Sequence, residues 1–170
     1  NVSTHVTSNE SFKIHPLGAN TMSNYERKVR VRRNQMGPEG YFGVTFRMNH
    51  LSEGGEGNDP AWGINNFVGY SFTIEANRLV LSKHQYDKQV LLTALSELIL
   101  AQEINFLVRI IGNDIAVFLG TSTVPVLEYS DPDPIYFGQG GIIHSCALIV
   151  YADVTIECFD HMGGNEYGDS

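Results

Sequence analysis

The sequence predicts an all-β fold, an antiparallel β-sandwich of two sheets in the jelly-roll style. Four segments alternate apolar with polar side chains at a period of two, which is typical of strands that bury one face and expose the other. Short turns built from Gly, Asn and Asp follow such segments. The 17 glycines and 6 prolines among 170 residues agree with a fold of many strands and loops.

The alternating segments extend from the first third of the chain to its end. Val29 and Val31 alternate with basic residues, and the same pattern fills 42–48, 68–74 and 150–156. Alternate positions of a strand lie on one face of a sheet, so we expect the apolar set to meet in one core. The predicted core residues are Val29, Val31, Phe42, Val44, Phe46, Phe72, Ile74, Val108, Ile110, Val117, Val154 and Ile156.

Turn chemistry predicts how the strands connect. The triplets at 75–77 and 112–114 are typical of hairpin turns. The second triplet joins 106–111 to 115–119, and because both of these runs are apolar on both faces, we expect them in the middle of the sandwich. Proline lacks the amide hydrogen that a strand donates, so Asp131-Pro132-Asp133-Pro134 predicts a rigid connection into the next strand.

The segment from Val90 to Ile104 departs from simple alternation. Its leucines at 91, 92, 95 and 98 are close to helical spacing, with good helix formers between them. A short helix is one interpretation, and a strand, a turn and a second strand is the other. We favour the strands, because the surrounding pattern is β.

Length and composition predict one domain. A chain of 170 residues can bury a substantial core, and we place a single β-sandwich domain at residues 1–158. Residues 159–170 are rich in glycine, which is typical of a linker or tail. We therefore expect the domain to be covalently linked to further domains, and its abrupt start at Asn1 is that of a mature or excised domain.

Charge, hydropathy and cysteine usage exclude several classes of partner. A net charge of −8 argues against nucleic acid, because a phosphate backbone would be repelled. No apolar run reaches the roughly 18 residues that a membrane span requires, so we expect no membrane insertion. Cys146 and Cys158 form neither a disulfide framework nor a metal motif. Strand alternation places Cys158 on the core face, which favours a buried thiol over the alternative of a disulfide.

The sequence gives no sign of an enzyme. It contains no nucleophile elbow, no zinc-protease motif, no phosphate loop and no dinucleotide fingerprint. Asp153 and Glu157 share a strand face, but they are roughly 13 Å apart along the strand, beyond the separation that two-carboxylate sugar hydrolysis uses. We therefore predict a non-catalytic protein.

Polar and aromatic residues around one long loop suit sugar binding instead. Trp62, the one tryptophan, lies in the loop at 49–66, where its ring face would stack on a sugar. Arg47 and Asn49 leave the preceding strand at this loop and offer hydrogen bonds to hydroxyl groups. His84 and Tyr86 belong to a polar turn between two strands, which is either a plain solvated hairpin or, if it lies at the same end, the far side of the sugar site. The alternative is that Trp62 folds under its own loop as a hydrophobic anchor.

Two further groups are candidates. His144, Tyr151 and Asp153 lie on the last two predicted strands and form a second possible sugar contact. No motif requires a cofactor, but the loop also carries Glu53, Glu56 and Asp59, whose oxygens are the ligands that calcium prefers. Calcium binding there is a hypothesis, and a plain soluble acidic loop is the alternative.

The succession of strand motifs resembles a known family. The motifs are Tyr41-Phe42-Gly43-Val44-Thr45-Phe46-Arg47, Asn77-Arg78-Leu79-Val80-Leu81-Ser82-Lys83-His84, Phe106-Leu107-Val108-Arg109-Ile110, and the stretch from Pro125 to Pro134 before Gly138-Gln139-Gly140-Gly141-Ile142. Together they resemble laminin-G-like, concanavalin A-like carbohydrate-binding modules, nearest the fructan-binding family 66 modules attached to glycosidases.

The resemblance implies a function and a location. It implies a non-catalytic module that targets a secreted glycan-active protein to a polysaccharide or oligosaccharide, outside the cell or at its surface. Two other functions stay open: a protein-recognition or adhesion module of the laminin-G kind, and a glycoside-active domain of the same fold.

Overall fold

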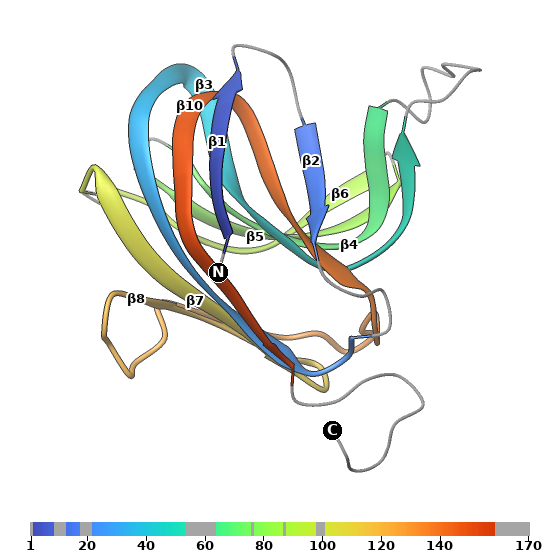
Figure 1. Ribbon diagram of the computed structural model, residues 1–170. Helices are drawn as coiled ribbons and strands as arrows, with labels where there is room; N and C mark the ends of the chain where they lie inside the picture. The colour runs from blue at the N-terminus through green and yellow to red at the C-terminus, as the bar shows by residue number, and fades with distance from the viewer. Residues whose placement is uncertain are drawn as a thin grey trace.

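The computed structural model shows two β-sheets packed face to face (Figure 1). It describes residues 2–8, 13–17, 22–53, 64–75, 77–86, 88–97 and 101–158, with side chains described at 22–32, 40–49, 67–75, 77–85, 89–97 and 101–143. Every pair of neighbouring strands is antiparallel. The predicted antiparallel two-sheet sandwich is confirmed. In these parts of the chain, no helix has the length and apolar character needed to cross a membrane.

Within the described residues, ten strands make up the two sheets. They are β1 (Val2–Ser8), β2 (Lys13–Leu17), β3 (Tyr25–Glu53), β4 (Ile64–Ile74), β5 (Leu79–Tyr86), β6 (Lys88–Leu95), β7 (Glu103–Ile111), β8 (Asp114–Leu119), β9 (Leu127–Ser130) and β10 (Gln139–Cys158).

The long strands β3 and β10 belong to both sheets. Residues 42–53 of β3 pair with β4, whereas residues 25–32 pair with β7. β10 follows β3 along both halves, with register shifts on the way (Figure 1). The first sheet therefore has the order β2-β10-β3-β4-β5-β6, and the second has the order β1-β10-β3-β7-β8-β9. Two continuous strands thus fix how the layers face each other.

The core lies between the two sheets, as the alternation predicts. All ten predicted core residues whose side chains are described are buried, from Val29 on β3 to Val117 on β8. Val154 and Ile156 lie on β10 beyond the described side chains. Phe72 of the first sheet meets Phe106 of the second edge to face, with ring centroids 5.1 Å apart. Such aromatic pairs add about 0.5–1.5 kcal/mol beyond the burial of area.

The connections also agree with the sequence. β4 and β5 form a hairpin in which Ile74 pairs with Leu79, and β7 and β8 form another around Gly112 and Asn113. The segment 90–104 is not described as a helix: β6 ends at Leu95 and β7 begins at Glu103. The favoured strand-turn-strand interpretation is therefore confirmed for the described residues.

One basic side chain in the first part of β3 is buried rather than exposed. Lys28, Arg30 and Arg32 are exposed, as a solvated strand face requires, but Arg27 points to the core. Its Nη1 donates to the carbonyl oxygens of Thr45, at 2.6 Å, and Gly141, at 2.8 Å. Arg27 starts from the part of β3 in the second sheet and ends on carbonyls of the first, so it links the layers. Arg27 lies on the same face of β3 as Val29 and Val31, and the structure buries all three side chains.

A second buried arginine holds one end of the sandwich. Arg47 lies where β3 bulges against β4, between Phe46 and Asn49, with a left-handed φ of 49°. Its side chain is 0% exposed. The guanidinium donates to four acceptors: the carbonyls of Ser23 (2.9 Å), Gly112 (2.7 Å) and Ile135 (2.7 Å), and Oδ1 of Asn24 (3.1 Å). Arg47 thereby joins three separate loops.

The segment Asp131–Gly138, which we call the strap, connects β9 to β10 across this end of the sandwich. Its carboxylate at Asp131 is buried and accepts hydrogen bonds from the Tyr70 hydroxyl, at 2.6 Å, and from Lys83 Nζ, at 2.8 Å. Tyr70 in turn accepts from the backbone amide of Ile135, at 3.0 Å. The predicted rigid connection is therefore anchored to β4 and β5 by a buried polar network.

The surroundings of Asp131 shift its pKa. Burial by itself would raise it, but the hydrogen bonds from Lys83, Tyr70 and the amide of Asp133 outweigh burial and lower the pKa. A carboxyl group with a lower pKa in the folded than in the unfolded state stabilises the fold when the pH is above its pKa in the unfolded state. This stabilisation is lost as the pH falls through the pKa of the folded state.

Replacing Arg47 with Ala is expected to lower the free energy of unfolding by about 3 kcal/mol, because hydrogen bonds from a buried charge are strong and their acceptors are left without a donor. Arg47→Gly should be less damaging by about 1 kcal/mol, since glycine adopts a positive φ without steric cost. Urea unfolding at pH 7 measures both. Arg32→Ala is the control, as Arg32 is exposed on the same strand. Wild-type stability in Arg47→Ala would contradict the role assigned here.

Replacing Asp131 with Asn is expected to cost about 2 kcal/mol at pH 7, where the carboxylate is ionised. The difference from the wild type should shrink below about pH 4, where Asp131 becomes protonated in the unfolded and then the folded chain. Urea unfolding at pH 7 and pH 3 checks this. Asp133→Asn, at an exposed neighbouring side chain, is the control. A difference that does not change with pH would show that the charge of Asp131 is not the stabilising feature.

Candidate functional site

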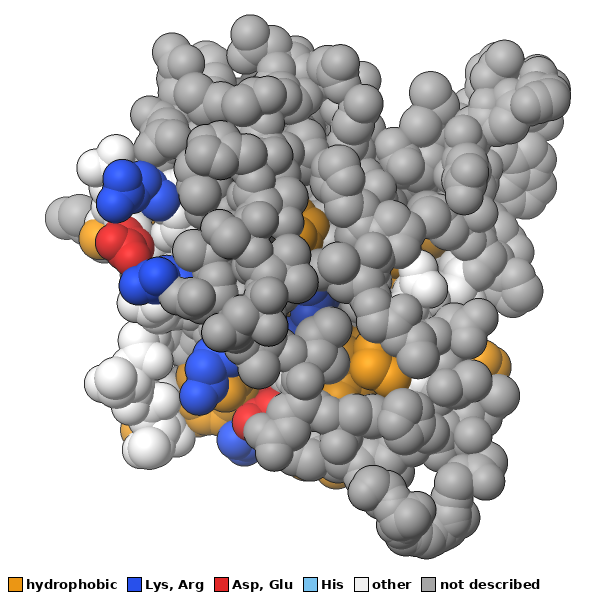
Figure 2. Space-filling view, viewed as in Figure 1, with side chains coloured by type: hydrophobic (Ala, Val, Ile, Leu, Met, Phe, Trp, Pro, Cys, Tyr) orange, Lys and Arg blue, Asp and Glu red, His pale blue; other side chains and the backbone are white. Residues whose placement is uncertain are grey.

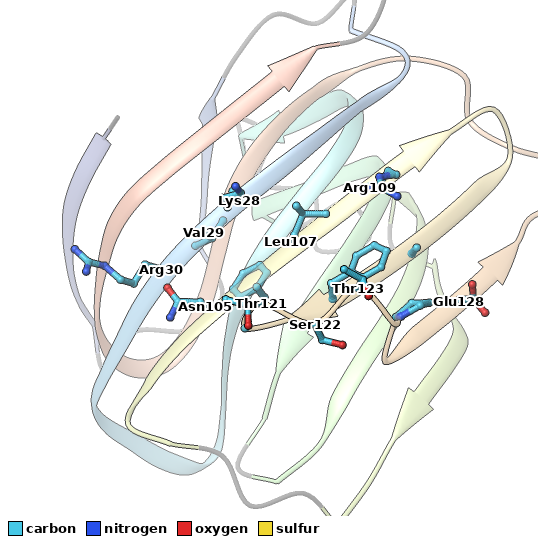
Figure 3. Close-up of a pocket in the computed structure, with 15 residues that line it drawn as sticks. Lys28, Val29, Arg30, Asn105, Leu107, Arg109, Thr121, Ser122, Thr123 and Glu128 are labelled. Atoms are coloured by element: carbon cyan, nitrogen blue, oxygen red, sulfur yellow. The ribbon is translucent and has the colours of Figure 1, made fainter.

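A groove of about 860 Å³ lies on the outer face of the second sheet (Figure 3). Val29, Phe106 and Val117 point into the core, so their neighbours along β3, β7 and β8 face outward. Three rows of outward-facing residues cross the sheet in register. Arg30 pairs with Asn105, Lys28 pairs with Leu107 and then Phe118, and Glu26 pairs with Arg109 and then Ala116.

The floor of the groove is apolar. Leu107 and Phe118 are directly opposite each other on β7 and β8, and both are only partly buried. The guanidinium of Arg109 lies over the Phe118 ring, 5.0 Å from its centroid, and its Nε is 3.0 Å from Oε2 of Glu26. This ion pair holds Arg109 against the ring. The middle of the groove therefore offers an aliphatic and an aromatic surface side by side.

The loop 120–125 forms one wall. Gly120 has a φ of 61°, which glycine adopts freely, and its amide donates to the carbonyl of Asn105 at 2.8 Å. Ser122 and Val124 exchange two hydrogen bonds of 3.1 Å through the serine hydroxyl. Beyond the loop, the amide of Val126 donates to the carbonyl of Val117 at 2.7 Å. The exposed Thr121, Ser122 and Thr123 are thus presented on a hydrogen-bonded turn.

Charged groups stand at both ends of the rows. Lys28 and Arg30 border the floor on the β3 side, while Glu128 of β9 lies on the far side (Figure 3). Asn105 stands between Arg30 and the loop, with both amide hydrogens and one oxygen to offer. Chemically, the arrangement suits a ligand with an apolar face and many hydroxyl groups.

At the predicted site around Arg47 and Asn49, the side chains are engaged in hydrogen bonds within the protein. Because no part of Arg47 is exposed, its guanidinium holds the sandwich together, and we do not retain it as a sugar contact. Asn49 is half-buried, and its Nδ2 donates to the carbonyl of Phe137 in the strap. A ligand role for Asn49 stays a prediction, limited to the oxygen of its side chain.

His84 is almost completely buried, with 7% of its surface exposed. Its ring stacks on Phe67 with centroids 4.4 Å apart, and Nε2 lies 2.7 Å from Oγ of Ser71. Burial lowers the pKa of His84 to about 4, so the imidazole is neutral at pH 7. These contacts fit a packed histidine, and its part in sugar binding stays a prediction.

The strand register brings two of the predicted segments to the same end of the first sheet. Asn49 pairs with Val68, which pairs with Gln85, the neighbour of His84. A smaller cavity of about 260 Å³ lies there, between β5, β6 and the strap. Its lining includes Lys83, whose ammonium group is already paired with Asp131.

For the other predicted ligand residues, the structure describes either the backbone alone or neither backbone nor side chain. Trp62 is outside the described residues, and so are Glu56 and Asp59. Glu53 ends β3 and Tyr86 ends β5, but their side chains are not described. Among the residues that the structure describes, no group of three or more His, Cys, Asp or Glu is placed to hold a metal ion. The Trp62 platform and the calcium hypothesis therefore stay predictions.

The third predicted group is spread along β10. His144 pairs with Phe42 of β3, in the first sheet, whereas Tyr151 pairs with Val31, in the second. Seven residues of extended strand separate the backbones of His144 and Tyr151 by roughly 23 Å. Asp153 follows at a register shift between Ala152 and Thr155. His144 is therefore not in one site with Tyr151 and Asp153.

The groove was not predicted from the sequence, although a signal was present. The runs on either side of Gly112 are apolar on both faces, which predicts that they lie in the middle of the sandwich. β7 and β8 are indeed inner strands of their sheet, but no described strand covers their outer faces. The apolar residues of that face, Leu107 and Phe118, are the floor of the groove. An apolar outer face beside a hydroxyl-rich loop was the available clue.

Known proteins match this chain in their fold but not in their sequence. No protein-family model and no curated protein matches the sequence. Solved structures do match. The carbohydrate-binding module CBM66 from Bacillus subtilis has a TM-score of 0.67 and 14% identity, with 92% of each chain covered.

Two further matches belong to the galectin-like folds. A protein of unknown function with a galectin-like fold from Bacillus subtilis has a TM-score of 0.67 and 11% identity, over 92% of this chain and 81% of that one. A variant of human galectin-16 has a TM-score of 0.61 and 9% identity, over 91% and 99%. The chain thus has the sandwich fold of carbohydrate-binding modules and galectins, and its predicted resemblance to concanavalin A-like modules is confirmed in the fold.

Proposed function

We propose that this protein is a non-catalytic carbohydrate-binding module, which targets a secreted glycan-active protein to a polysaccharide. The observation that carries the proposal is the groove of the second sheet, with its apolar floor of Leu107 and Phe118 and its polar rim. The likeness of the fold to a carbohydrate-binding module and to galectins supports it. Secretion and attachment to an enzyme rest on the sequence resemblance.

The groove has the two properties that sugar binding in water requires. A hydrogen bond to a sugar hydroxyl replaces one to water, so each contributes only about 1 kcal/mol. Burial of the C–H face of the sugar on Leu107 and Phe118 adds a further term, at about 25 cal/mol per Å² of apolar surface. Asn105 and the Thr121–Thr123 loop provide donors and acceptors around this floor. A volume of about 860 Å³ accommodates more than one sugar ring.

The lining of the groove favours binding over hydrolysis. Among the lining residues that the structure describes, Glu128 is the one carboxylate, whereas glycosidases use a pair. The nearby Glu26 is held in an ion pair with Arg109. Neither arrangement gives the acid and the base or nucleophile that must face one glycosidic bond.

Replacing Phe118 with Ala is expected to weaken polysaccharide binding by roughly 1–3 kcal/mol, because the ring provides much of the apolar floor. Affinity gel electrophoresis against soluble plant and microbial polysaccharides, fructans included, measures this. Tyr136→Ala is the matched control, since Tyr136 is an exposed aromatic residue that does not line the groove. Thermal unfolding of each variant excludes loss of the fold as the cause.

A Trp62→Ala variant, run beside Phe118→Ala, distinguishes the groove from the predicted loop site. Loss of binding with Phe118→Ala alone supports the groove. Loss with Trp62→Ala alone moves the site to the loop and contradicts the role of the groove. If no polysaccharide retards the wild-type protein, the proposed function itself is wrong.

We also predict that the protein releases no reducing sugar from the polysaccharide that it binds best. An assay of reducing ends after prolonged incubation at pH 5 and pH 7 checks this. The decisive contrary result would be activity that disappears in Glu128→Gln, a variant of nearly identical shape without the carboxylate. Such a result would favour the glycoside-active alternative.

A further inference from the structure

The charges at the groove balance each other. Its lining has three basic residues and one acidic residue, namely Lys28, Arg30, Arg109 and Glu128. Two further carboxylates lie beside it, because Glu103 pairs with Arg30 and Glu26 pairs with Arg109. Figure 2 shows acidic and basic side chains next to one another on the side of the molecule where β3 and β7 run. With no excess of either sign among these residues, the groove favours a neutral ligand that forms hydrogen bonds.

One of the three rows of the groove includes a small residue between two charged ones. From β7 to β9 this row consists of Arg109, Ala116 and Glu128, which pair in register. Ala116 has the smallest side chain of the three rows, and it is only partly buried. The backbones of Arg109 and Glu128 are two strand spacings apart, or roughly 10 Å. We call the space above Ala116, between these two side chains, the hollow.

Arg109 presents hydrogen-bond donors to the hollow. Its Nε is 3.0 Å from Oε2 of Glu26, on the β3 side, while its guanidinium carbon is 5.0 Å from the centroid of the Phe118 ring, on β8. The guanidinium therefore extends over β8, and the ion pair with Glu26 leaves its two terminal nitrogens for a ligand. An arginine side chain has N–H donors and no acceptor.

Glu128 presents acceptors from the opposite side of the hollow. Its side chain is exposed, and it faces outward because the adjacent Leu127 is buried in the core. Among the described residues, no ion pair engages Glu128. Figure 3 shows Arg109 and Glu128 at the same end of the groove, away from Arg30 and Asn105. The hollow is therefore polarised, with donors on β7 and acceptors on β9.

We propose that the hollow binds the acetamido group of a neutral 2-acetamido sugar, whose ring lies on Leu107 and Phe118. This inference rests on the proposed function and names its ligand class. The N–H and the C=O of a trans amide point in opposite directions, so one acetamido group donates to Glu128 and accepts from Arg109 at the same time. Its methyl group then lies over Ala116, beside the Phe118 ring.

A hydroxyl group fits the hollow less well than an acetamido group. A hydroxyl has a single polar atom, so it does not span the distance between Arg109 and Glu128. It also buries no apolar surface at Ala116, whereas the acetamido methyl does. Hydrogen bonds to charged partners are stronger than those between neutral groups, and only the acetamido group makes two of them here. The hollow therefore distinguishes sugars that differ in the substituent at C2.

Three pairs of methyl glycosides test the proposal. The pairs have the gluco, galacto and manno configurations, and the two members of each pair differ only in an acetamido or a hydroxyl group at C2. Titrations followed by the amide NMR shifts of the protein measure every affinity. We expect about tenfold tighter binding of the acetamido member in at least one pair, with the largest shifts on β7, β8 and β9. The pair that shows the preference identifies the configuration.

Filling the hollow should remove the preference. Ala116→Val adds a branched side chain that strands favour, so the fold is retained while the space for the acetamido methyl is lost. Binding of the hydroxyl sugars should be unchanged. Ala94→Val makes the same substitution at a partly buried position of β6, outside the groove lining, and should leave the preference intact. A preference that survives Ala116→Val, or an equal loss in both variants, would overturn the inference.

Removing either polar partner should also reduce the preference. Arg109→Gln removes the guanidinium donors and Glu128→Ala removes the acceptors, so each should bring the two affinities of the preferred pair closer together. Arg78→Gln is the matched control, because Arg78 forms an ion pair with Glu75 and is similarly exposed, at 40% against 43% for Arg109. An equal reduction in Arg78→Gln would mean a general effect of charge and would contradict the roles of Arg109 and Glu128.

The outcomes separate this inference from the proposed function. Equal affinities within all three pairs, together with polysaccharide binding that Phe118→Ala weakens, overturn the acetamido inference and support the carbohydrate-binding function. No binding of any glycoside or polysaccharide overturns the proposed function and the inference together.

Discussion

The end of the sandwich depends on one buried guanidinium. Arg47 has no exposed surface, so its buried charge requires hydrogen-bond acceptors within the protein, and the structure supplies four. Those acceptors come from the entry to β3, the β7–β8 turn and the strap, three segments far apart in the sequence. The positive φ of Arg47 aims the side chain at them, at a steric cost that the four hydrogen bonds offset.

Arg27 makes a comparable connection deeper in the fold. It crosses from the part of β3 in the second sheet to carbonyls of Thr45 and Gly141 in the first. Gly140 leaves the space for it, because a Cβ at that position would lie 2.9 Å from Nη1 of Arg27. Since β3 and β10 also pass through both sheets, the layers are tied by backbone and by side chain alike. The outer face of the second sheet is therefore built on strands held at several points.

The sequence was sufficient for the fold because strand alternation is a local pattern. Val29 and Val31 of β3 and Phe72 of β4 are buried where the alternation places them, and the turn around Gly112 forms where its residues favour it. The buried arginines were not foreseen. Arginine is usually a surface residue, so the sequence predicts exposed side chains for Arg27 and Arg47. The carbonyl groups that accept their hydrogen bonds come together only in the folded structure.

The site could be predicted less well, for a related reason. Trp62 was the predicted platform because it is an aromatic residue in a loop, whereas Phe118 lies in a strand and has the pattern of a core residue. Whether a strand residue faces a core or a groove depends on what covers the sheet, which alternation does not encode. His84 shows the converse case. It is polar and lies near a turn, yet Phe67 and Ser71 enclose it.

The position of the groove matters for how weak contacts add up to useful affinity. Each hydrogen bond to a sugar hydroxyl contributes little binding free energy. The entropy lost when flexible side chains become ordered on binding would therefore offset most of that free energy. Here Leu107 and Phe118 stand on neighbouring paired strands, and Arg109 is already fixed by Glu26. The serine hydroxyl of the loop is likewise committed to its own turn. Contacts that are fixed before binding lose little conformational entropy when a ligand arrives, so the floor of the groove suits a ligand whose ring is recognised by shape.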